Sequence, residues 1–212
     1  MLTLALALVA TLLAVPGPAL TSRPADTLAV VPRRFVLDLV IDPASATWTG
    51  SLRGWLTVRR PVRAFVLRFA NPTTSRVEMN QLAGATPLAF GTRGRDSLLV
   101  VTDRPMVAGP AGLNVGWVAA FADTGRGAVR TGRGAVAIVR GAGTAYPAFP
   151  RAAPAAAWTV DVHVPAGSRV RANLPSAGIT RQLGWRTWEF VSRGPLDPDS
   201  LRISVVAARE RR

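Results

Sequence analysis

Hydrophobic and polar residues alternate along most of the chain. From residue 33 onward, short segments rich in Val, Leu, Phe and Trp are separated by Gly, Pro, Asn and Asp. A period of two is typical of β-strands, because successive side chains point to opposite faces of a sheet. Outside the N-terminal apolar run, no window of useful length repeats apolar residues at helical spacing. The pattern predicts an all-β protein, either an antiparallel β-sandwich or a curved, layered antiparallel sheet.

The clearest predicted strand covers residues 34–42 and is followed, after a short turn, by a second strand at 48–60. The two are expected to pair as an antiparallel hairpin. The buried face of the first strand would hold every second residue, namely Phe35, Leu37, Leu39 and Ile41. Similar runs predict further strands at 64–70, 76–82, 87–91, 97–102, 114–121, 135–140, 158–164, 169–174, 185–191 and 201–207.

The N-terminus carries a predicted secretory signal. Residues 2–15 are apolar, and the Pro-Gly-Pro break that follows suits a signal-peptidase site after Ala19, although the first Arg is only Arg23. The run is shorter than the roughly 20 residues that cross a bilayer, so we expect cleavage, with retention as a short anchor as the alternative. The expected organisation of this secreted or periplasmic protein is a signal peptide (1–19), a flexible leader (20–32), one β-domain (33–208) and a charged tail (209–212).

The charge balance is strongly basic. The chain has 26 basic and 12 acidic residues, a net charge of +14, and every basic residue is Arg. This excess either marks a surface that binds anionic partners weakly, such as lipid headgroups or acidic polymers, or is an ordinary solvated surface, which we favour. No nucleic-acid partner is expected. The chain has no Cys, so disulfides and thiolate metal sites are excluded and stability has to come from packing.

One internal repeat is present. TGRGAVR at residues 124–130 is followed at once by TGRGAVA at 131–137. The two Gly-Arg-Gly turns could present the guanidinium groups of Arg126 and Arg133 to a phosphate or a carboxylate. A tandem duplication in a tolerant hairpin loop explains the same residues, and this is the interpretation we favour.

Candidates for catalysis are few. The single His, His163, lies two residues from Asp161 on the polar face of its predicted strand. A solvated sheet face explains this pair best, with a pH-sensitive contact as the alternative. Asp197 and Asp199 could form a paired-carboxylate site, but the prolines beside them favour a plain turn. We predict no catalytic residue, no metal site and no cofactor.

The six Trp residues are candidates for the core or for an interaction surface. Trp158 shares a face with Val160 and is expected in the core. Trp185 and Trp188 are three residues apart in one predicted strand, so they point to opposite faces and one of them is a candidate for an exposed contact. Trp48, near a turn, is a second candidate for exposure.

Residues 144–167, TAYPAFPRAAPAAAWTVDVHVPAG, resemble a family signature. The N-terminal β-domain of aminopeptidase N-like zinc metallopeptidases carries a pattern of the form F-P-C-F-D-E-P-A-x-K-A-x-F-x-L-x-V-x-V-P. Aligned without a gap, it is matched exactly or by type at Tyr146, Pro147, Phe149, Ala153, Ala156, Trp158, Val160, Val162, Val164 and Pro165. The family's following turn is matched by Asn173 and Pro175, and the resemblance extends over most of the chain after the signal.

The departures from this pattern bear on function. The family's Asp-Glu-Pro falls on Pro150, Arg151 and Ala152, and its Lys falls on Ala155. The family's zinc site uses H-E-x-x-H and a distant Glu in a separate helical domain, and a catalytic zinc needs three protein ligands. A chain with one His cannot build that site.

The resemblance therefore implies a non-catalytic domain that acts as a protein-interaction or bracing module, with a peptidase catalytic chain or another envelope protein as its partner. The first alternative is the N-terminal part of a split or truncated zinc aminopeptidase that works with a separate catalytic chain. The second is an Arg-rich adhesin of anionic surfaces.

Overall fold

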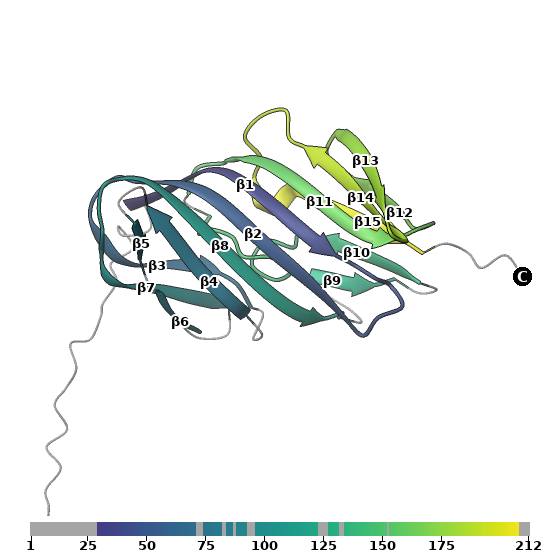
Figure 1. Ribbon diagram of the computed structural model, residues 1–212, viewed down its shortest axis with the longest axis horizontal. Helices are drawn as coiled ribbons and strands as arrows, with labels where there is room; N and C mark the ends of the chain where they lie inside the picture. Colours follow the sequence, from purple (N-terminus) through teal and green to yellow (C-terminus); the bar gives the residue numbers. More distant parts are fainter. Residues whose placement is uncertain are drawn as a thin grey trace, which may run out of the picture.

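The computed structural model describes residues 29–70, 74–81, 84–86, 88–92, 96–122, 127–131, 134–151 and 153–207. The predicted signal peptide, most of the predicted leader and the predicted tail lie outside these residues. Within the described ranges, no helix has the length and apolar character needed to span a membrane. The described part of the chain is built almost wholly from strands, as the sequence pattern predicts (Figure 1).

The largest layer is an eight-stranded sheet within the described part of the chain, in the order β13-β14-β11-β1-β2-β8-β4-β5. Its centre is the predicted hairpin, in which Leu37 faces Leu52 in an antiparallel register. The strands are β1 (Val30–Val40), β2 (Thr47–Val58), β4 (Thr74–Gln81), β5 (Gly84–Thr86), β8 (Gly109–Ala120), β11 (Ala157–Pro165), β13 (Ser176–Gln182) and β14 (Trp185–Val191).

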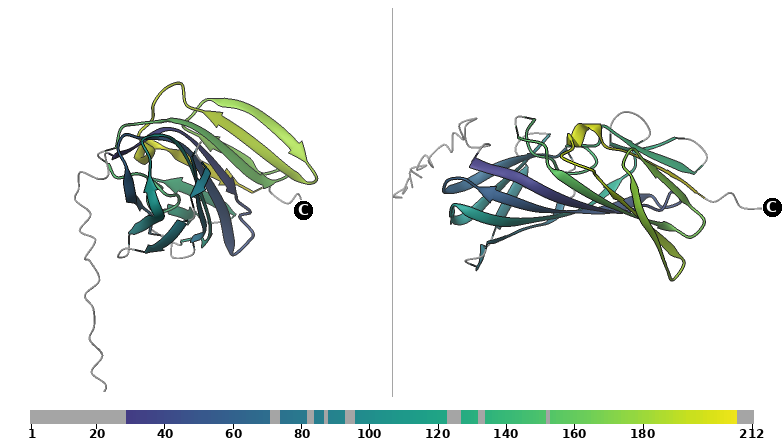
Figure 2. Two further views of the ribbon diagram at one scale, coloured as in Figure 1. Left: turned by 60° about the vertical axis from the view of Figure 1, so that its left-hand side comes forward. Right: turned by 90° about the horizontal axis from the view of Figure 1, so that it is seen from above.

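Two smaller sheets lie on one side of the large one (Figure 2). The described strands of the first are in the order β12-β15-β10-β9, and those of the second in the order β3-β7-β6. Buried side chains from all three sheets form one core cluster. The strands are β3 (Val62–Arg68), β6 (Leu88–Thr92), β7 (Ser97–Met106), β9 (Gly127–Arg130), β10 (Ala135–Val139), β12 (Arg169–Ala172) and β15 (Arg202–Val206).

The first strand differs from the prediction in two ways. It begins at Val30, so the predicted leader 20–32 extends too far, because Val30 pairs with Val58 and both are buried. Its other neighbour, β11, runs parallel to it, with Leu37 opposite Val160. The all-β class is confirmed, but the sheet is not purely antiparallel. Two parallel strands need a long connection between them, and here the chain between β1 and β11 supplies it.

The duplicated segment forms strands rather than only a loop. β9 comes from the first copy and β10 begins within the second, and the two pair antiparallel with Ile138 opposite Ala128. One residue of each copy, Ala128 and Val136, is buried in the core, as is Ile138, which directly follows the second copy. Arg126 and Arg133, the predicted contacts, lie outside the described residues.

Candidate functional site

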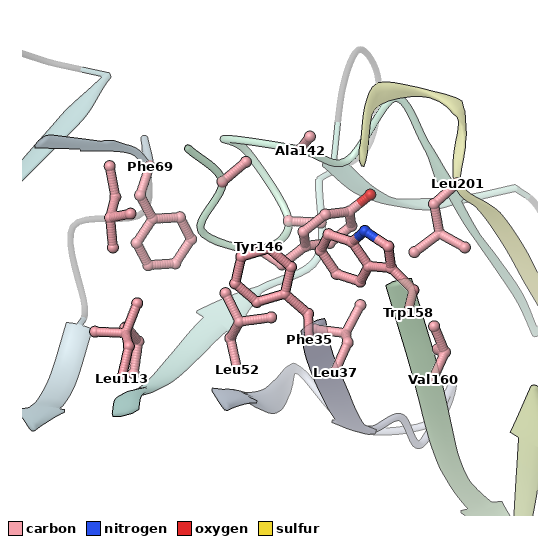
Figure 3. Packing of buried hydrophobic residues seen from close by; sticks show 14 of the residues in the cluster. Phe35, Leu37, Leu52, Phe69, Leu113, Ala142, Tyr146, Trp158, Val160 and Leu201 are labelled. Atoms are coloured by element: carbon pink, nitrogen blue, oxygen red, sulfur yellow. The ribbon is translucent and has the colours of Figure 1, made fainter. Parts of the chain in front are cut away.

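The aromatic residues of the signature meet in the centre of the core (Figure 3). Tyr146, from the loop between β10 and β11, packs edge-on against Trp158 at a ring distance of 5.8 Å. Phe35 of β1 lies 4.8 Å from Trp158, and Phe149 stacks on Phe65 of β3 at 5.9 Å. These rings are buried. Tyr146, Phe149 and Trp158 are therefore packing residues that hold the loop against two sheets.

Backbone hydrogen bonds fix the path of this loop. The carbonyl of Gly141 accepts the N–H groups of Ala145 and Tyr146 at 2.7 and 3.2 Å. Arg68, the last residue of β3, exchanges two backbone hydrogen bonds with Ala148 at 2.7 and 3.0 Å. The Tyr146 hydroxyl donates to the carbonyl of Pro198 at 2.8 Å. The loop is thus tied both to β3 and to the short 3-10 turn Pro198–Ser200.

A pocket of about 510 Å³ lies between this loop and that turn. Three aromatic residues of the core, Phe35, Phe149 and Trp158, line it together with small or rigid side chains, and four charged residues complete the lining. The small and rigid residues are Pro32, Ala148, Pro150, Ala153, Pro154, Ala155, Ala156 and Pro198, and the charged ones are Arg68, Arg151, Asp197 and Asp199. A mostly apolar pocket of this size with a few polar groups is typical of binding sites.

An ion-paired group occupies one side of the pocket. Asp199 accepts from both Arg68, at 3.4 Å, and Arg151, at 3.2 Å. The Arg68 Nε also donates to the carbonyl of Phe149 at 3.2 Å. Arg151 stands where the family has Glu, so the departure from the signature reverses a charge and gives Asp199 a partner. The Arg151 side chain stays 76% exposed, which leaves its outer N–H donors open to another group.

The turn predicted around Asp197 and Asp199 is observed. The Asp197 Oδ1 accepts the backbone N–H of Asp199 at 2.9 Å and caps the 3-10 turn, as Asx residues commonly do. The two carboxylates therefore have separate tasks, and nothing in their contacts resembles an acid–base pair. What the sequence could not show is that this turn closes a pocket against the signature loop.

The later signature residues also have structural contacts. Asn173 follows β12 and bridges to the end of the 3-10 turn, where its Nδ2 donates to the carbonyl of Ser200 at 2.8 Å. Its Oδ1 accepts the N–H of Arg202 at 2.8 Å. The carbonyl of Pro175 accepts the N–H of Val191 at 3.0 Å, and Pro165 is the last residue of β11. These contacts join neighbouring strands and contribute no side chain to the pocket.

The single His lies on the outer face of the large sheet. Its Nε2 is 3.3 Å from Asp38 Oδ1, and its Nδ1 is 2.8 Å from the hydroxyl of Thr187. Burial, together with the nearby carboxylates of Glu189 and Asp38, raises the pKa of Asp161. Among the described residues, no three His, Cys, Asp or Glu side chains are grouped in a way that could hold a metal ion.

The Trp residues divide into buried and exposed positions. Trp158 is in the core, as predicted. The prediction of exposure for Trp48 is wrong: it is buried because it packs edge-on against Trp117 at 6.1 Å. Trp185 and Trp188 point to opposite faces of β14, since Trp185 is exposed and Trp188 packs partly against the core. Sequence reasoning missed Trp55, which is exposed beneath the Arg34 guanidinium at 5.4 Å.

The fold, an eight-stranded sheet covered by two smaller sheets with the signature loop packed between them, is shared with M1 zinc metallopeptidases. The crystal structure of the M1 zinc metallopeptidase from Deinococcus radiodurans matches with a TM-score of 0.68 and 20% identity over 84% of this chain and 42% of that chain. A point mutant of it bound to a Tyr-Ser-Ala substrate matches with a TM-score of 0.69 and 19% identity over the same shares.

The predicted resemblance is therefore confirmed at the level of the fold. This chain spans less than half the length of the peptidases it matches, since 42% of each is covered. No family model matches the sequence, and no curated protein matches it either.

Proposed function

We propose that this protein is a non-catalytic binding module whose pocket receives an apolar side chain of a partner polypeptide. The pocket itself carries the proposal, because rigid Pro, Ala and aromatic residues line it and an ion-paired group borders it. A desolvated pocket that accepts one anchor residue is a common centre of a protein interface. The partner segment would place an acidic residue beside its anchor, within reach of the outer donors of Arg151.

The sequence supports a binding role over a chemical one. A catalytic zinc needs three protein ligands, whereas this chain has one His and no Cys. The one His is engaged by Asp38 and Thr187 on the outer face of the large sheet. Fold resemblance alone transfers no activity. In this proposal the protein is secreted or periplasmic, exported by the signal at residues 1–19, so its partner is a peptidase-like chain or another envelope protein.

The test is a pull-down from the native envelope with three forms of the chain starting at residue 20. Ala155→Trp places a large side chain at the pocket, and Ala108→Trp adds the same side chain in the turn between β7 and β8 as a matched control. We expect one polypeptide to be captured by the wild type and by Ala108→Trp at low and high salt, and to be lost with Ala155→Trp. Equal capture by all three forms would contradict a pocket-centred interface.

A second candidate function follows from the share of each chain that is aligned. Because 84% of this chain covers only 42% of an M1 peptidase, it could be the N-terminal part of a split or truncated aminopeptidase. This candidate predicts that the captured polypeptide carries an H-E-x-x-H motif and that mixing the two chains produces aminopeptidase activity with bound zinc. A partner without that motif, and a mixture without activity, would leave the binding module as the function.

A further inference from the structure

The turn between β13 and β14 holds Leu in a conformation that suits other residues better. Leu183 and Gly184 have φ angles of 44° and 81°. Two central residues with positive φ are typical of type I′ hairpin turns, which favour Asn, Asp and Gly. Leu pays a steric cost there. Its side chain is 93% exposed, so packing within the fold does not compensate. An apolar residue that is strained and buries nothing points to a contact outside the molecule.

Aromatic and cationic residues lie just behind this apex. Trp185 is 39% exposed and Ile179 is 49% exposed. Arg181 and Arg186 face each other across the two strands, an arrangement that is unfavourable for like charges. Within the described part of the chain, neither Arg forms an ion pair with an acidic side chain. From residue 164 to residue 188 the sequence has four Arg and no Asp or Glu.

We propose that the tip of the β13–β14 hairpin inserts into the headgroup region of an anionic lipid bilayer. A strand rises about 3.3 Å per residue, so the facing pair Arg181 and Arg186 lies roughly 7 Å behind Leu183, and Trp185, which pairs with Gln182, lies about half as far behind it. Interfacial elements bury their apolar part about 5–10 Å deep. Leu183 then reaches the acyl boundary, Trp185 lies at the headgroups, and the two guanidinium groups bind lipid phosphates.

The shape and charge of the tip favour a lipid surface over a protein partner. A stable protein interface needs about 800 Å² on each side, with a central cluster of anchors. Here the exposed apolar residues are Leu183 in the turn, Trp185 directly behind it and Ile179 further back in β13, on a hairpin that projects from the molecule (Figure 2). Charges of one sign close to this apolar tip complement a surface of anionic headgroups. The tip and the pocket of the proposed function are separate sites.

The test is co-sedimentation of the chain starting at residue 20 with lipid vesicles. Removing residues 1–19 takes away no described residue, and it removes an apolar run that would bind lipid by itself. Vesicles of phosphatidylcholine alone are compared with vesicles containing about 30% phosphatidylglycerol, a composition in the range where surface potential is appreciable. We expect binding to be at least about tenfold tighter to the anionic vesicles and to weaken as salt is raised.

Variants separate insertion from simple charge attraction. Leu183→Asn suits the turn, so the variant should fold at least as well, and we expect it to bind about tenfold more weakly. Arg181→Gln with Arg186→Gln should weaken binding by about tenfold or more. Val107→Asn, at an exposed apolar residue in the turn between β7 and β8, is the matched control and should bind like the wild type.

Brominated acyl chains provide a second readout, since they should quench part of the wild-type Trp emission and less of it in Trp185→Phe. Three results would overturn the proposal: no binding to anionic vesicles, equal binding to neutral ones, or Leu183→Asn bound as tightly as the wild type. Capture of an envelope protein through the hairpin, with no vesicle binding, would also overturn it and assign the tip to a protein interface.

Discussion

The signature loop and the β13–β14 hairpin use the same residue types in opposite environments. Trp158 of the first is 2% exposed and surrounded by rings, whereas Trp185 of the second is 39% exposed. Arg68 and Arg151 share Asp199, whereas Arg181 and Arg186 face each other. The comparison shows that the neighbours of a residue, rather than its type, determine whether its side chain packs in the core or stays exposed. The comparison can be tested by making the same change in both regions.

The largest expected difference is between Trp158→Ala and Trp185→Ala. Removing a fully buried Trp leaves a cavity, so Trp158→Ala should lower the free energy of unfolding by about 3–5 kcal/mol. Trp185→Ala removes a side chain from the sheet margin and should cost less than about 1 kcal/mol. Urea unfolding monitored by far-UV circular dichroism measures both. Similar losses for the two variants would mean that the hairpin belongs to the core as firmly as the loop does.

The next comparison is between two glycines, Gly141 and Gly178, each replaced by alanine. A Cβ on Gly141 would lie 2.6 Å from Ile138 and 2.9 Å from the Tyr146 ring, so Gly141→Ala should destabilise the fold by about 1–3 kcal/mol. A Cβ on Gly178 of β13 meets nothing within 4 Å. Gly178→Ala should therefore change stability by no more than about 0.5 kcal/mol. Thermal unfolding of the two variants side by side decides whether the loop is as tightly packed as described.

A smaller effect is expected from the hydroxyl of Tyr146, the only Tyr in the chain. Tyr146→Phe removes the hydrogen bond to Pro198 and should cost about 1 kcal/mol. Burial, followed by the charge of Asp199, raises the pKa of the phenol above its ordinary value. Because the folded state keeps this proton longer than the unfolded state, wild-type stability should fall as pH rises above about 10.

Absorbance at 295 nm measures the ionisation of Tyr146 directly, since no other phenol contributes. Tyrosinate should form only as the protein unfolds, and the Phe variant should lack the part of the alkaline loss that the phenol causes. Ionisation of the native protein near pH 10, the ordinary range of a phenol, would contradict the burial of this ring.

The smallest expected effect is a gain. Leu183→Asn relieves a left-handed Leu that packs against nothing, so stability should rise by roughly 0.5 kcal/mol. Leu183→Ala keeps the unfavourable conformation and should leave stability nearly unchanged. Differential scanning calorimetry resolves shifts of this size. A loss of stability in the Asn variant would show that Leu183 has a packing role within the fold.

The strands with clean alternation could be predicted, whereas contacts between distant segments could not. In β1 and β11 one face is buried and most positions of the other are half-buried or exposed, so the period of two is visible in the sequence. β13 has the sequence SAGITRQ and is exposed along nearly its whole length, so it carries no such signal. The exposure predicted for Trp48 is wrong because the burial of this side chain depends on Trp117, which belongs to a different strand.

The candidate pocket was half predictable. The resemblance identified Tyr146, Phe149 and Trp158, but the pocket also needs the end of β3 and a turn some 50 residues further along, where Tyr146 bonds to Pro198 at a separation of 52 residues. The local pattern of hydrophobic and polar residues holds no information on contacts between segments so far apart in the sequence. The charge reversal at Arg151 was seen in the sequence, but its partner Asp199 was assigned only to a turn.

The parallel pairing of β1 with β11 sets the order in which the chain can fold. Arg34 and Thr159, whose side chains touch, are 125 positions apart, so this ladder forms only after most of the polypeptide is available. The conformational entropy of closing so large a loop is lost before its contacts can stabilise the fold. Such non-local topology is associated with slow folding. A chain with this topology completes its central sheet only when the residues near position 160 are available, which is late in its synthesis.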